Sequence, residues 1–200
     1  MLHMGRLELK YSVAFTIAFF VIALTNILMH FSHNITGLST ILYCFFIIAW
    51  ASTVAWRIVH KKVRRNNIAI AASLFVLFAI RFCRFDLFID SPVISRYLWY
   101  FYYFSYIVMP MLSLSAASFV GKGENERMAP VIKTELAVSG LLMPGVLTND
   151  IHHFVFRIVD ESDVNSPAEY NRLYFVILIW LAFITINSYI ILIDRCRLSQ

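Results

Sequence analysis

The stretch that decides the fold carries no charge, and residues 11–56 read YSVAFTIAFFVIALTNILMHFSHNITGLSTILYCFFIIAWASTVAW. Its 46 residues include no aspartate, glutamate, lysine or arginine. One helical crossing of a bilayer needs about 20 apolar residues, so this stretch is long enough for two crossings. The polar residues from His30 to Gly37 divide it, and they predict two helices joined by a short turn.

The composition of the whole chain is that of a membrane protein. Of the 200 residues, 60% are hydrophobic and 14% are charged, and the mean hydropathy is +0.72. A soluble domain carries about 25% charged residues. The three cysteines, Cys44, Cys83 and Cys196, follow no disulfide or metal-binding spacing. This composition excludes a disordered chain, a disulfide-stapled secreted domain and a nucleic-acid-binding module.

The rest of the chain predicts four further membrane-spanning helices. We therefore expect an all-α fold, a polytopic transmembrane bundle of six spans that forms a single domain with no soluble catalytic domain. Unbroken apolar runs exclude a membrane β-barrel, whose strands alternate apolar and polar residues. The predicted spans are residues 11–30, 38–59, 66–85, 96–120, 134–153 and 173–193.

Lysine and arginine predict the orientation, because they concentrate on the cytoplasmic side of a membrane. With the amino terminus inside, residues 1–10, 57–66, 121–135 and 194–200 carry twelve basic and five acidic residues. The opposite face carries five basic and seven acidic residues. We predict a multi-pass protein of the inner (plasma) membrane with both termini in the cytoplasm. The net charge of +5 then describes orientation and not affinity for an acidic partner.

The most unusual polar cluster lies at the predicted external end of the fifth span, where residues 147–154 read LTNDIHHF. Its candidates for ligand or signal sensing are Asn149, Asp150, His152 and His153. Such groups at a helix end can bind a ligand or change protonation near neutral pH, or they can simply cap the helix. On a continuing helix Asp150 and His153 would share a face. No further ligand completes a metal site, so we predict none.

Arg81 and Arg84 form a second candidate pair, three residues apart on the third predicted span. An arginine inside the hydrocarbon must extend its guanidinium outward or pair with an acid. The alternatives are an interfacial anchor paired with Asp86, a counter-charge for an anionic ligand, and an inter-helix pair with Asp150.

Two other patterns have mainly structural interpretations. The aromatic run from Tyr97 to Tyr106 predicts an interfacial belt and a packing surface. Pro110 and Pro144 lie inside predicted spans and should kink them. No signature of a membrane enzyme appears, neither G-x-S-x-G nor H-E-x-x-H nor a phosphate-binding glycine loop. We therefore expect no enzymatic activity, no catalytic residue and no cofactor.

Four motifs carry a family resemblance: Arg64-Arg65, Arg81-x-x-Arg84, RYLWYFYY at residues 96–103, and LTNDIHH at residues 147–153. On these motifs, residues 57–197 resemble the histidine kinase N-terminal seven-transmembrane region, the membrane input module of bacterial sensor kinases in two-component systems. The resemblance implies a sensory module that perceives an external or membrane-borne signal and passes it to a cytoplasmic output domain. It points to Asn149, Asp150 and His152, with His153, Arg81 and Arg84 as lesser candidates.

The sequence departs from this family at its carboxyl end. Relatives continue past the position of Cys196 with two more spans and an output domain, whereas the sequence ends at Gln200. We expect a truncated or split gene product, or a stand-alone sensor that works through a partner, with no kinase activity of its own. Expected partners are the lipid bilayer, an unidentified small ligand or membrane signal, a cytoplasmic output protein and a second copy in a homodimer. The alternatives are a small-solute transporter or transporter subunit, and a non-functional remnant.

Overall fold

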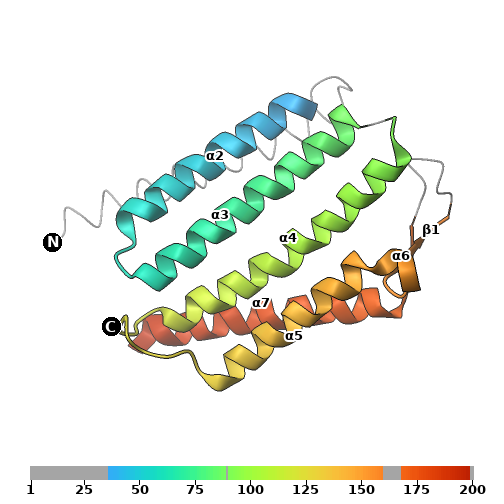
Figure 1. Ribbon diagram of the computed structural model, residues 1–200. Coiled ribbons are helices and arrows are strands. Elements are labelled where there is room, and N and C mark those ends of the chain that lie inside the picture. Colours follow the sequence, from blue (N-terminus) through green and yellow to red (C-terminus); the bar gives the residue numbers. More distant parts are fainter. Residues whose placement is uncertain (1–35, 89, 160–167, 199–200) are drawn as a thin grey trace. The chain divides into compact units, whose positions relative to one another are not determined.

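The structure is a computed structural model that describes residues 36–88, 90–159 and 168–198 (Figure 1). The described residues are mostly α-helical, which confirms the predicted all-α class. The chain divides into two compact units, residues 1–46 and residues 47–200, with the boundary inside the first described helix. The first predicted span, residues 11–30, lies outside the described residues.

Each of the five other predicted spans overlaps a long helix, and the fifth, residues 134–153, also includes the short helix α6 (Asn149–His152). The long helices are α2 (Thr36–Arg57), α3 (Lys61–Phe82), α4 (Pro92–Phe119), α5 (Pro130–Leu147) and α7 (Arg172–Leu198). A π-helical turn, η1 (Cys83–Leu87), extends α3, and a short helix, α6 (Asn149–His152), follows α5. Helices α4 and α5 each begin with a proline. Its missing N–H is tolerated there, because the first N–H groups of a helix have no carbonyl partner within the helix. Pro110 and Pro144 lie inside helices, as predicted.

Four of the described helices are long and apolar enough to cross a membrane: Thr40–Arg57, Lys61–Leu87, Pro130–Leu147 and Arg172–Arg197. The 28-residue α4 is not among them, because tyrosines and serines lower its hydropathy. This helix contacts α3, α5 and α7, and Figure 1 shows it running between them. A helix covered by other helices needs less apolar surface, and its small polar residues allow close packing. Ser95, Ser105 and Ser118 of α4 are accordingly buried.

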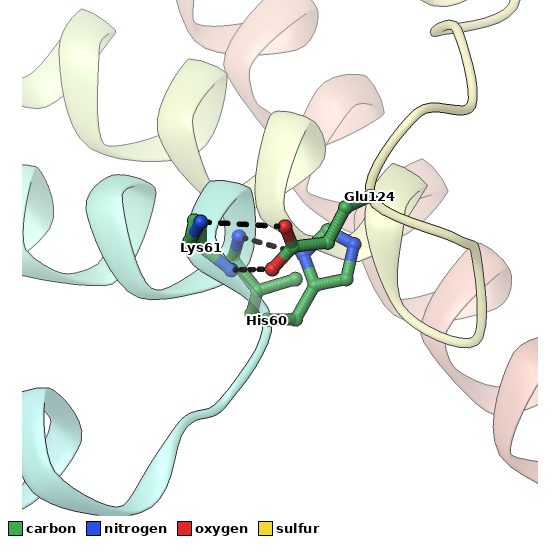
Figure 2. A network of polar contacts seen from close by, with 4 residues as sticks. His60, Lys61 and Glu124 are labelled. Carbon is green, nitrogen blue, oxygen red and sulfur yellow. Dashed lines mark hydrogen bonds and ion pairs between the residues drawn. The ribbon is translucent and has the colours of Figure 1, made fainter.

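Residues 47–200 have two chemically different ends. At one end, which we call the basic end, α3 and α5 begin and α4 and α7 finish (Figure 1). There Lys61 Nζ lies 3.8 Å from a carboxylate oxygen of Glu124, and the Lys61 N–H donates to Glu124 (Figure 2). Lys62 Nζ donates to the carbonyl oxygen of Glu126 at 2.8 Å. These exposed contacts join the start of α3 to the α4–α5 loop, each contributing about 1 kcal/mol or less.

The opposite end, which we call the hairpin end, carries a feature that the sequence pattern did not predict. Strands β1 (Phe156–Ile158) and β2 (Ala168–Tyr170) form an antiparallel pair between α6 and α7, with Phe156 opposite Tyr170. The sequence predicted only a non-spanning segment over residues 154–172. The hairpin is anchored because Val155 and Phe156 are fully buried in the main apolar cluster, beside Tyr100, Tyr103, Val146 and Ile177.

Candidate functional site

Asn149 begins α6, and it holds the hairpin in place. Its side chain is buried, with 1% exposed. The Nδ2 group donates to the carbonyl oxygen of Phe156 at 2.7 Å, and Oδ1 accepts from the N–H groups of Val155 and Phe156 at 3.0 and 3.4 Å. An amide side chain can both donate and accept hydrogen bonds. That of Asn149 therefore bonds to buried backbone groups that have no partner in a helix or strand. Asn149 therefore acts as a structural clamp, with its polar atoms already used.

The clamp places the Phe156 ring inside an aromatic cage on α4. Ring centroids of Trp99, Tyr100 and Tyr103 lie 4.6, 5.2 and 5.4 Å from that of Phe156. Such tilted and stacked pairs add about 0.5–1.5 kcal/mol each beyond the burial of their area. The aromatic run of α4 is thus a packing surface for the hairpin, which is one of the two roles that the sequence predicted for it.

Asp150 is the candidate residue that joins two helices while staying accessible. Its Oδ1 accepts a short hydrogen bond from the phenol of Tyr100 and lies 3.9 Å from Nε of Arg96. The side chains of Asp150 and Arg96 keep 32% and 19% of their surface exposed. This contact connects the α5–α6 junction to the first turns of α4. The carboxylate pairs with Arg96, so the alternative of an inter-helix pair between Asp150 and Arg81 is not what the structure shows.

The two histidines serve the turn after α6. His152 Nδ1 accepts from the N–H of Phe154 at 3.0 Å, and its ring lies over the Phe154 ring. The expectation that Asp150 and His153 share a face of a continuing helix is wrong. The helix ends at His152, and His153 adopts a left-handed conformation with φ of 51°. Its carbonyl accepts from Asn171 Nδ2 at 2.6 Å, so the backbone of His153 ties the turn to the start of α7.

The two arginines of the second candidate pair have different surroundings. Arg84 Nε donates to Ser95 Oγ at 3.0 Å, and its guanidinium lies 5.6 Å from the Trp99 ring centroid. Arg84 therefore packs against α4. Arg81 faces a groove lined by α3, α4 and α7, and it forms no hydrogen bond or ion pair with another residue of the described chain. The alternative that paired Arg81 with Asp86 is thus not seen.

The sequence patterns did not identify a group of polar contacts between α5 and α7, towards the basic end. We call this group of Glu135, Ser139 and Asn187 the polar seam. Glu135 is only 8% exposed, and both its carboxylate oxygens accept from Asn187 Nδ2 at 2.9 Å. Trp180 Nε1 donates to the buried Ser139 hydroxyl at 3.0 Å. The sequence patterns placed Glu135 in a cytoplasmic segment and gave Asn187 no role in a site. The usable clue was a polar residue inside each of two apolar runs, since such residues face a bundle interior.

These groups can bind and position, but they do not form a familiar catalytic set. The described residues bring no three His, Cys, Asp or Glu side chains together as a metal site. The polar groups around Asp150 are its carboxylate, the imidazoles of His152 and His153 and the Arg96 guanidinium, which suit recognition of a polar ligand. Comparison with protein-family models, with curated proteins and with solved structures finds no match for the chain.

Proposed function

We propose that the chain is a membrane-embedded sensory input module without kinase activity of its own. The observation that carries the proposal is the Asp150 contact at the hairpin end. It is partly exposed, it joins the α5–α6 junction to α4, and it is built from charged and polar groups that a ligand can compete for. The resemblance of residues 147–152 to the input regions of sensor kinases supports the same assignment.

The proposed orientation places the hairpin end outside and the basic end in the cytoplasm. Eight basic residues lie near the basic end. They are the paired Lys61 and Lys62 together with Arg57, Arg64, Arg65, Lys133, Arg195 and Arg197. Positive residues are retained on the cytoplasmic side of a plasma membrane. The full proposal is six spans, with both termini inside and a cytoplasmic output protein as partner, in a protein that pairs with a second copy.

The proposed mechanism is a shift between two arrangements of α5 against α4. A ligand that engages Asp150 or His152 would weaken the bond to Tyr100 and the pairing with Arg96. The Pro144 carbonyl accepts from both the N–H and the hydroxyl of Thr148, where α5 ends and before α6 begins, and we place the hinge at this junction. The Glu135–Asn187 bond couples α5 to α7, whose last turn carries Arg195 and Arg197. A ligand shifts such an equilibrium only by its difference in affinity for the two states.

A small-solute transporter, or a subunit of one, is the second candidate. The polar seam of Glu135, Ser139 and Asn187 favours it, because transport paths need polar groups within the membrane. These groups satisfy one another in the structure, which suits a fixed helix contact better than an open path. Solute uptake by proteoliposomes that contain the pure chain would support the transporter.

Complementation tests the sensory proposal. Cells that lack the chain receive wild type, Asp150→Asn, Asp150→Ala or His152→Ala, and their phosphoproteomes are compared at matched membrane levels. We expect the Asp150 and His152 variants to lower the restored phosphorylation by about tenfold, within the usual range of coupling energies of about 1–3 kcal/mol. Glu169→Ala, on the exposed strand β2 at the same end, is the matched control and should restore it. Full restoration by every variant would remove Asp150 and His152 from the site.

A further inference from the structure

A groove that the sensory proposal does not use lies between α3, α4 and α7 near the hairpin end. Its volume is about 1010 Å³, at the upper limit of small-molecule sites. The floor is a stripe of α4, and its aromatic members Trp99, Tyr102, Tyr103 and Tyr106 recur at helical spacing. The walls are mainly aliphatic and aromatic side chains of α3 and α7.

One full charge faces this groove, and no acidic residue in the described part of the chain pairs with it. Arg81 lines the wall from α3, it is exposed, and no described residue forms an ion pair or hydrogen bond with it. It lies six residues before Leu87, the end of the apolar span Lys61–Leu87, which is about 9 Å along the helix. A guanidinium at that depth can reach the headgroup layer while its stem stays in the hydrocarbon. A cation there favours an anionic group beside it.

A second unsatisfied donor belongs to Tyr102, a residue that also lines the groove. The hydroxyl oxygen of Tyr102 is shielded from solvent and has no hydrogen-bond partner among the described residues. The phenol lies within electrostatic range of the Arg84 and Arg81 guanidiniums. Since buried polar groups are normally hydrogen-bonded, this one calls for a partner that the described residues do not supply. An anionic oxygen between Arg81 and Tyr102 would satisfy both donors.

The apolar part of the groove has the length of one lipid tail. Its lining along α7 runs from Tyr174 to Thr185, which is about 16 Å of helix. This is about half of the 30 Å hydrocarbon core, the depth of a single leaflet. The lining residues beyond Tyr174 are Ile177, Leu178, Leu181, Ala182 and Thr185, which offer almost no polar contact.

We propose that this groove is a binding site for one anionic phospholipid. Its phosphate accepts hydrogen bonds from Arg81 and Tyr102, and one acyl chain lies along the α4 stripe and the α7 wall. The guanidinium is suited to phosphate because its planar N–H groups can bind two oxygens at once. The site is separate from the Asp150 contact, and its occupancy does not depend on the proposed sensory role.

Native mass spectrometry of the full chain in detergent tests the proposal. The purified protein is titrated with phosphatidylglycerol or with phosphatidylcholine of the same chain length. We expect one retained phosphatidylglycerol per chain, in preference to the zwitterionic lipid. Arg81→Gln and Tyr102→Phe should each weaken its binding by about tenfold or more, since a hydrogen bond to a charged group is worth about 1.5–3 kcal/mol. Tyr102→Phe removes a single oxygen, so it keeps the test valid if the arginine variant is unstable.

Two further variants separate the groove from general surface charge. Arg172→Gln removes an exposed arginine of α7 that does not line the groove, and it should leave binding unchanged. Ala182→Trp fills the tail region and should abolish retention of the lipid. Equal loss with Arg81→Gln and Arg172→Gln would contradict the proposal. Normal retention of the lipid by Ala182→Trp would also contradict it. So would a wild-type protein that retains no lipid and forms a dimer, if Ala182→Trp separates that dimer.

Discussion

Asn149→Ala should lower the melting temperature of the purified protein by about 10 °C. The substitution removes three hydrogen bonds to the backbone of Val155 and Phe156, both of which are fully buried. A buried backbone group left without a partner costs about 1–3 kcal/mol. We expect a loss of about 3 kcal/mol in unfolding free energy, which corresponds to roughly 10 °C in a domain of this size. Thermal unfolding in detergent, followed by circular dichroism, measures it.

Asn171→Ala is the matched control for Asn149→Ala. Asn171 is also an asparagine whose side chain donates to a backbone carbonyl of the same turn, that of His153, but it is exposed. Water can replace its bond, so we expect a loss of less than about 1 kcal/mol. Trypsin should also cut after Arg157 faster in Asn149→Ala than in the control. Equal melting temperatures for the two variants would show that Asn149 does not hold the hairpin in place. Asn149 would then again be a candidate for ligand binding.

Phe156→Ala should be the most destabilising single substitution at the hairpin end. The ring is fully buried and lies within 5.4 Å, centroid to centroid, of Trp99, Tyr100 and Tyr103. Removing a fully buried phenylalanine costs about 3–5 kcal/mol, from lost burial and from the cavity that remains. Water that enters beside Trp99 should shift its fluorescence to longer wavelength. Thermal unfolding and tryptophan emission together measure the effect.

Phe154→Ala controls for the loss of an aromatic ring in this segment. Phe154 is 65% exposed and touches His152, so its removal leaves no cavity. Its melting temperature should stay within about 2 °C of wild type, because exposed substitutions change stability by about 0.5 kcal/mol or less. If Phe156→Ala melted like Phe154→Ala, the hairpin would contribute nothing to the stability of the bundle.

Sequence predicted the helices well because four of the five long ones are apolar runs of bilayer length. Five predicted spans overlap described long helices, and their bounds differ by several residues, most at the fifth span, where α5 ends at Leu147. The hairpin could not be predicted, since its strands hold three residues each, too few for an alternating pattern to stand out. They exist because Phe156 fits a cage built by residues that lie more than fifty positions earlier.

The candidate site was located by its residue types, but the roles of those residues depend on long-range contacts. The cluster at residues 147–154 pointed to polar function, yet the structure uses Asn149 for backbone bonds that only the folded turn creates. The partner of Asp150 is on α4 and not on α3, because the geometry of the α5–α6 junction selects it. Glu135 and Asn187 are fifty-two positions apart, so a single sequence offers no sign that they meet.

The proposed sensory function requires that a change at Asp150 reaches the opposite end of α7. Cys196 is exposed near that end of the helix, and in a variant with Cys44 and Cys83 replaced by alanine it becomes the single labelling site. A membrane-impermeant maleimide is applied to intact cells and to permeabilised cells, with wild-type Asp150, Asp150→Asn or Glu169→Ala. We expect no labelling in intact cells, and after permeabilisation a labelling rate that Asp150→Asn changes severalfold while Glu169→Ala leaves it unchanged. Labelling of Cys196 in intact cells would contradict the proposed orientation, and equal rates in all three proteins would contradict the coupling.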